Sequence, residues 1–148
     1  MLNKLNLDNR IKDIIKETVN IIIDSLHTKK LEIFLFGSMA KGNARNNSDI
    51  DIGILVKDTK KLEKNPHFES KLALRIEKEL KIKTPLDIRV LNNAGLRFIN
   101  QVLKYGRLVF SRNEKERVIF ETTSISNYFD FRPFLKEYEK IREQRFGL

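Results

Sequence analysis

The chain has 148 residues, the usual size of one domain. Its net charge of +9 favours a partner that carries phosphate groups, either a nucleotide or a nucleic acid, although a general role in solubility explains this charge equally well. The absence of cysteine excludes a disulfide framework, a thiolate metal site and a cysteine nucleophile, and two histidines are too few for a histidine metal cluster. No apolar run approaches the roughly 20 residues that span a bilayer, so we expect a cytoplasmic protein without a membrane partner.

An amphipathic helix is the first predicted element, from Asp8 to Leu26. Its isoleucine, valine and leucine residues recur at helical spacing with charged residues between them. We expect this apolar stripe to cover a sheet rather than to bind a partner. An apolar run with strand composition then extends from Leu31 to Phe36.

The strand is followed by Gly37 and Ser38, where the backbone must turn and a helix can begin. A strand, a tight loop and a helix N-terminus together offer free N–H groups, and glycine lets a phosphate approach the backbone closely. Gly37 and Ser38 are therefore the candidates for phosphate contact. Lys41 and Arg45 lie near enough in sequence to reach the same phosphates, and each reads equally well as an ordinary loop cation.

The next predicted strand, Ile50 to Val56, carries Asp51 and is preceded by Asp49. Because side chains alternate along a strand, both carboxylates project from one face while the isoleucines enter the core. Two neighbouring acids repel unless a cation lies between them, and oxygen ligands suit Mg²⁺ or Mn²⁺. The pattern predicts a metal site.

A second helix is expected from about Phe68 to Lys81. No aromatic residues interleave with its basic residues as stacking platforms would require, so a nucleic-acid partner is not favoured. A third strand, Leu86 to Leu91, follows with Asp87 and Arg89 on one face. Asp87 is a candidate third acid, with an exposed acid on an edge strand as the alternative, and Arg89 either faces phosphates or neutralises the acids.

The chain ends in a short helix over Asn92 to Leu103, a short strand over Arg107 to Phe110 and an aromatic-rich helical tail that Pro133 should kink or restart. We expect one α/β domain over residues 1–148, with a catalytic core at about 29–110 and a helical tail at 112–148. Its small mixed β-sheet should have helices packed on one face, and the open face should hold the site.

Gly37 to Gly42 read G-S-x-x-x-G, and after five further residues Ser48 to Ile52 read S-D-I-D-I. This pattern resembles the signature of the DNA polymerase beta superfamily, most closely its minimal nucleotidyltransferases (MNT), as in the MNT antitoxins paired with HEPN toxins. The resemblance is tight from Leu31 to Val56 and looser to about Phe110. Without it, the same residues would read as two strands and a turn with surface acids.

The resemblance implies a polymerase-beta-like nucleotidyltransferase fold and Mg²⁺-dependent transfer of a nucleoside monophosphate to a hydroxyl, with ATP as the commonest donor. In this family a pair of metal ions is held by acids, which here would be the catalytic and metal-binding Asp49, Asp51 and Asp87. The phosphates would be bound by Gly37 and Ser38, assisted by Lys41 and Arg45.

Three functions follow from the resemblance. The leading hypothesis is an antitoxin that adenylylates a tyrosine of a partner HEPN-type toxin. The alternatives are an aminoglycoside-type small-molecule nucleotidyltransferase, for which 148 residues leave little room for an acceptor domain, and a non-catalytic toxin-binding module. Tail aromatics have the residue types of interface hot spots. We expect the tail to help hold the acceptor protein, with Phe129 and Phe131 packed against the sheet.

Overall fold

The computed structural model describes residues 5–42, 48–56, 62, 64–92 and 94–146. Helices and strands alternate along them in this order: α1 (Asn9–Ser25), β1 (Leu31–Phe36), α2 (Gly37–Lys41), β2 (Ile50–Val56), α4 (Phe68–Leu80), β3 (Leu86–Val90), α5 (Leu96–Tyr105), β4 (Arg107–Ser111) and α6 (Glu114–Phe146). The predicted elements are present with shifted ends. The largest shift is in α5, which begins at Leu96 because Gly95 is its extended N-cap.

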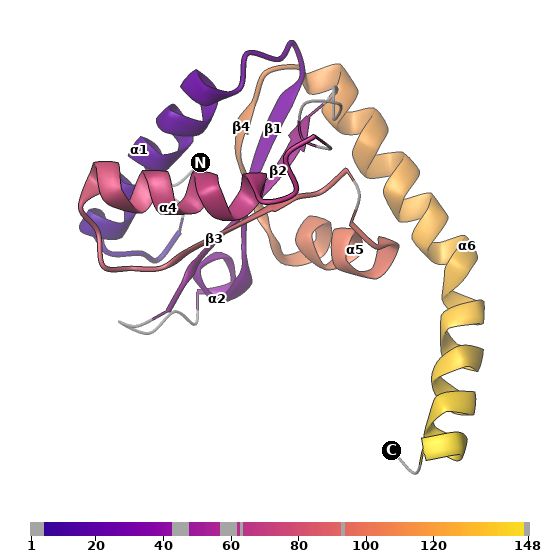
Figure 1. Ribbon diagram of the computed structural model, residues 1–148. Coiled ribbons are helices and arrows are strands. Elements are labelled where there is room, and N and C mark those ends of the chain that lie inside the picture. Colours follow the sequence, from indigo (N-terminus) through magenta and orange to yellow (C-terminus); the bar gives the residue numbers. More distant parts are fainter. Residues whose placement is uncertain (1–4, 43–47, 57–61, 63, 93, 147–148) are drawn as a thin grey trace.

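Within the described residues, four strands form one sheet in the order β3-β2-β1-β4. β1 pairs antiparallel with β2 and β4, whereas β2 and β3 are parallel and are connected across α4 (Figure 1). The sheet is therefore mixed, and the predicted α/β class is confirmed. The two strands that carry acids, β2 and β3, lie side by side.

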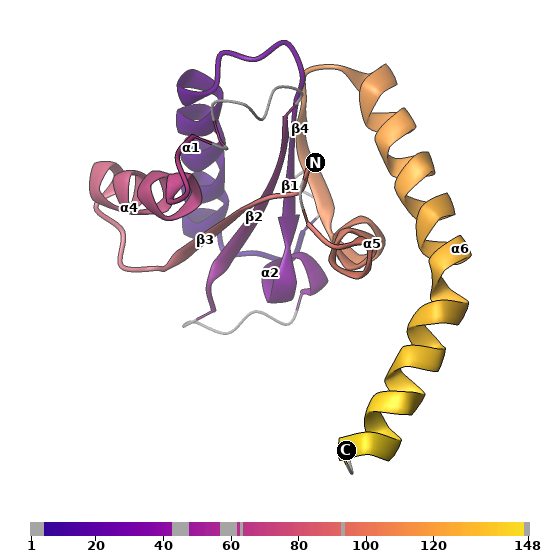
Figure 2. The same ribbon diagram turned by 45° about the vertical axis from the view of Figure 1, so that its right-hand side comes forward.

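One face of the sheet packs against α1 and α4, which lie together on that side in Figure 2. The strand residues of this core are aliphatic and buried, among them Ile33, Leu35, Ile52 and Ile54, each with 0% of its surface exposed. Alternation along β2 sends Ile52 and Ile54 inward and leaves Asp51 on the opposite face, as predicted.

The opposite face is also covered in part, which corrects the expectation that helices pack on one face only. A second apolar cluster forms there around Phe34, Leu55, Leu91 and Val102, with Phe36, Phe98 and Phe120 packed against it. The second face of β1 carries the aromatic rings of Phe34 and Phe36, so a helix is needed on this side as well to remove them from water. α5 and the beginning of α6 supply that cover.

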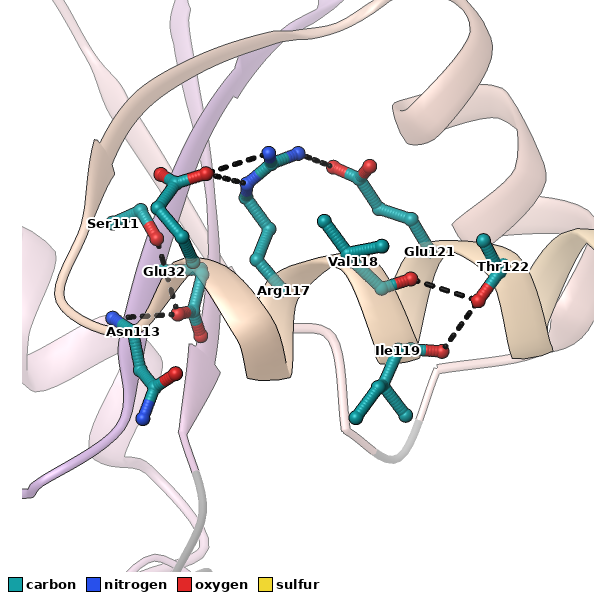
Figure 3. Close-up of polar contacts among 9 residues, drawn as sticks. Glu32, Ser111, Asn113, Arg117, Val118, Ile119, Glu121 and Thr122 are labelled. Atoms are coloured by element: carbon teal, nitrogen blue, oxygen red, sulfur yellow. Dashed lines mark hydrogen bonds and ion pairs between the residues drawn. The ribbon is translucent and has the colours of Figure 1, made fainter.

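Glu32 connects the sheet to the beginning of α6 (Figure 3). Its side chain is almost fully buried, and one carboxylate oxygen accepts hydrogen bonds from the Asn113 amide and the Ser111 hydroxyl, both at 3.4 Å. Burial is the main cause that raises the pKa of Glu32 above its usual value. Asn113 caps the helix in turn, since its side-chain oxygen accepts from the Glu116 amide at 3.2 Å.

α6 is a single helix of 33 residues that contains Pro133. It bends along its length and extends away from the sheet, so Pro133 does not restart the helix (Figures 1 and 2). Phe129 and Phe131 do not pack against the sheet as expected but are 59% and 45% exposed. No helix within the described ranges is long and apolar enough to cross a membrane.

Candidate active site

Gly37 is the point at which the predicted phosphate loop meets one of the predicted acids. β1 ends at Phe36, and Gly37 adopts φ +72°, a left-handed conformation that favours glycine. A Cβ at this position would collide with the Asp51 carboxylate Oδ2 and lie 3.0 Å from its Cγ. The backbone of Gly37 and the Asp51 side chain therefore touch, and only glycine fits both the conformation and the space.

The helix that follows is short. α2 has five residues, and its C-cap is Gly42, whose amide donates to the carbonyl of Ser38. Because the dipole of so short a helix is small, close approach to Gly37 and Ser38 contributes more to anion binding here than a helix field does. Ser38 is partly exposed beside it.

Asp51 and Asp87 are direct neighbours, since they pair in register across the parallel strands β2 and β3. Burial, then the negative charges of Asp87 and Asp49, raises the pKa of Asp51 to about 6, against a smaller lowering by Arg89. Asp49 lies exposed just before β2. The structure therefore brings the three predicted acids close enough to repel one another, which is the electrostatic condition that favours a bound cation.

These acids do not form a complete metal cage. Among the described residues, no three carboxylate or imidazole side chains are grouped as a ready-made metal site. Asp87 is instead paired with Arg89, its Oδ2 accepting from Arg89 Nε at 3.3 Å. The donor chemistry nonetheless fits Mg²⁺, which is commonly bound by one or two carboxylates together with substrate phosphates and water.

Lys41 lies at the end of α2 on the side that faces α5. Its Nζ is 4.9 Å from the ring centroid of Tyr105, and Lys104 Nζ is 5.1 Å from the same ring. The sequence singled out Lys41 but neither of these neighbours. Arg45, the other predicted phosphate-binding cation, lies outside the described residues.

The sequence pattern singled out Arg89 but not the aromatic residues that surround it beside the acids. The guanidinium of Arg89 lies 5.3 Å from the ring centroid of Phe98, and Phe98 meets Phe36 edge-on with centroids 5.4 Å apart. Phe36 immediately precedes Gly37, and Arg89 is two residues from Asp87. Phe98 lies on α5, so no local spacing could have revealed the contact.

A family model described as polymerase beta, nucleotidyltransferase, matches residues 9–115, a range that includes the loop at Gly37 and all three acids. The chain belongs to the polymerase beta nucleotidyltransferase family. This membership confirms the predicted fold and the predicted class of enzyme. No curated protein sequence gives a significant match.

Solved structures agree with this nucleotidyltransferase assignment. A toxin–antitoxin crystallised with AMP-PNP contains a chain that is 25% identical, with a TM-score of 0.70, over 87% of this chain and 95% of the other. A complex of a tri-AMPylated Shewanella oneidensis HEPN toxin with its MNT antitoxin matches at 22% identity and TM-score 0.67, over 90% and 96%. A nucleotidyltransferase-like protein of Sulfolobus solfataricus matches at 24% and TM-score 0.50, over 71% and 84%.

The last two structures are less than 25% identical to this chain and support its fold alone. The structural neighbours include minimal nucleotidyltransferase antitoxins in complex with HEPN toxins, as the sequence pattern predicted.

Proposed function

We propose that this nucleotidyltransferase transfers AMP from ATP to a tyrosine hydroxyl of a HEPN-type partner toxin and thereby acts as its antitoxin in the cytoplasm. The observation that carries the proposal is the match to 95% of a chain in a toxin–antitoxin structure that holds AMP-PNP. The contact between Gly37 and the Asp51 carboxylate supports it, because it joins a phosphate loop to an acid that can hold a metal.

We assign the triphosphate to the side of Asp51 that faces Gly37 and Ser38. The amides of Gly37 and Ser38 would hold the β- and γ-phosphates, and their positive partners would be Lys41 and Arg45. Lys41 stands beside Lys104, so two cations flank the approach to the loop from α5.

The acids are assigned to the metal. Asp49 and Asp51 would hold a pair of Mg²⁺ ions, and Asp87 would share one of them. When bound, Mg²⁺ neutralises the phosphate charge and lowers the pKa of the acceptor hydroxyl. Ligation requires Asp51 to be ionised, and its raised pKa of about 6 still leaves it mostly ionised at neutral pH.

The reaction is an in-line displacement at the α-phosphorus. The hydroxyl oxygen forms a bond to that phosphorus, the bond to the bridging oxygen of the β-phosphate breaks, and pyrophosphate leaves with the electron pair. The hydroxyl proton passes to a site carboxylate or to water. The chain's own contribution is to position the phosphates at Gly37 and to stabilise charge around Asp51.

Co-purification with the product of the neighbouring gene, followed by intact-mass analysis after incubation with ATP and Mg²⁺, tests the proposal. We expect the partner to gain one or more AMP masses, mapped by peptide analysis to tyrosine. Transfer to an aminoglycoside without partner modification would instead support a small-molecule nucleotidyltransferase. Tight binding of the partner without any transfer would support a non-catalytic toxin-binding module.

A further inference from the structure

The strand order determines the side from which the acceptor must approach. Gly37 follows β1 and touches Asp51 on β2, whereas Asp87 lies on β3, beyond β2 in the order β3-β2-β1-β4. An in-line displacement puts the attacking oxygen and the leaving pyrophosphate on opposite sides of the phosphorus. If pyrophosphate leaves toward Gly37, the acceptor arrives from the side of β3, the last strand of the sheet in the described residues.

The outer edge of β3 is poorly suited to pairing with a strand of the acceptor. The backbone amides of Leu86 and Val90 already donate to the carboxylates of Glu77 and Glu69, at 2.9 and 3.2 Å. An added strand would have to displace both glutamates of α4. Recognition of the acceptor at this edge therefore depends on side chains rather than on backbone pairing with β3.

The side chains available are those around Arg89 and Phe98. Arg89 projects from the same strand face as Asp87 and stacks on Phe98, which Phe36 supports edge-on. A cavity of about 370 Å³ opens beside this stack, lined by Glu69, Arg89, Val90, Ala94, Gly95 and Phe98. This volume is at the small end of ligand sites and suits one side chain better than a larger molecule.

The ion pair between Arg89 and Asp87 stabilises the fold too little to explain why Arg89 lies where it does. Its side chains are 54% and 43% exposed, and exposed pairs contribute at most about 1 kcal/mol. A planar guanidinium held against one aromatic ring is, however, suited to stack on a second ring. The cavity thus combines the planar guanidinium of Arg89, apolar walls and the carboxylate of Glu69. These surroundings suit an aromatic ring with a polar group at its tip.

We propose that Arg89, Phe98 and this cavity form the acceptor subsite, which holds the ring of the tyrosine that receives AMP. The inference rests on the proposed function, and it assigns to Arg89 a role that phosphate binding or neutralisation of the acids does not include. Arg89 and Phe98 place the phenol beside Asp87, with its hydroxyl directed toward the α-phosphorus.

Steady-state transfer to the partner protein tests the subsite through the KM values of both substrates. Arg89→Lys keeps the charge and loses the planar stack, and Phe98→Leu loses the ring. Each should raise the KM for the partner about tenfold and leave the KM for ATP nearly unchanged. The matched controls are Arg75→Lys, an equally exposed ion-paired arginine on α4, and Phe110→Leu on β4, and both should retain wild-type values. An unchanged KM for the partner, or an equal rise for ATP, overturns the assignment.

A binding measurement separates this inference from the proposed function. Titration of the full chain with N-acetyl-tyrosinamide should produce a saturable shift of the Arg89 Nε–H signal by NMR, and Phe98→Leu should abolish it. A shift of equal size at Arg75, or none at Arg89, contradicts the subsite. Failure of wild-type protein to label any tyrosine, with the Arg89 shift intact, would overturn the proposed function and leave the aromatic-binding cavity standing.

Discussion

At the scale of single residues, Asp51 is the side chain on which the candidate site depends. It touches the backbone of Gly37 on one side and pairs in register with Asp87 on the other. Its raised pKa reflects burial and the repulsion of two acids, so without a cation the ionised form is less favourable than it is for an ordinary aspartate. A bound metal ion would relieve this repulsion, and without one the Asp51 carboxylate lowers the stability of the fold.

Replacement of Gly37 should separate the effect of backbone strain at positive φ from the effect of a collision with Asp51. Gly37→Ala combines positive φ with a clash against Asp51, and we expect it to abolish ATP binding in calorimetry and to cost about 2–3 kcal/mol of unfolding free energy. Gly42→Ala is the matched control, since φ there is +79° and a Cβ would meet nothing within 4 Å. It should cost about 1 kcal/mol and retain ATP binding. Equal behaviour of the two variants would show that the contact with Asp51 is unimportant.

The raised pKa of Asp51 predicts a pH-dependent stability difference. The native state holds this proton up to pH about 6, against 3.8 ordinarily, so the wild type loses stability as pH rises through that interval. Asp51→Asn removes the charge and should be about 1–2 kcal/mol more stable at pH 8 without divalent ions, allowing for partial solvent screening. Urea unfolding should show the gap closing below pH 4. A gap that is independent of pH would contradict this explanation.

At the scale of elements, the strands and α1 were predictable because their patterns are local. β2 alternates between buried isoleucines and the face of Asp51, and Asp8 caps α1 by accepting from the Arg10 amide. The register that pairs Asp51 with Asp87 was not predictable, since it depends on how two strands separated by α4 align. The same holds for the contact of Arg89 with Phe98, which the packing of α5 against the second face of the sheet creates.

The anchor of α6 gives an element-scale prediction. Glu32→Ala would leave the Asn113 amide and Ser111 hydroxyl without their buried acceptor and open a cavity, so we expect a loss of about 2–4 kcal/mol in chemical denaturation. Glu32→Gln keeps an acceptor oxygen of the same shape and should cost less than half as much. If both variants lose the same stability, the carboxylate's charge rather than its hydrogen bonds stabilises the beginning of α6.

At the scale of the whole molecule, α6 exposes large aromatic side chains beyond the sheet. Phe134 and Tyr138 are 70% and 63% exposed, and Phe129 and Phe131 on the same helix are also exposed. Large exposed apolar patches are typical of interaction sites, and aromatic residues are enriched at their energetic centres. This arrangement is consistent with the proposed role of the tail in holding the partner.

Replacement of two of these exposed aromatics should weaken the complex without unfolding the chain. Phe134→Ser combined with Tyr138→Ser should reduce recovery of the partner in pull-downs at least about tenfold, because buried aromatic anchors contribute most interface energy. Leu74→Ser, at an apolar position on α4 that is 58% exposed, is the control and should leave recovery unchanged. Full recovery with the double variant would show that α6 does not contact the partner.

Transfer of labelled AMP from ATP to the co-purified partner, measured with Asp51→Asn, tests whether Asp51 and its neighbouring acids carry out nucleotide transfer. We predict a loss of at least about 10³-fold, equivalent to about 4 kcal/mol, with the complex and circular dichroism unchanged. Asp87→Asn should behave similarly, EDTA should abolish wild-type transfer, and Asp24→Asn on the exposed face of α1 should remain fully active. Transfer by Asp51→Asn at the wild-type rate would contradict the account.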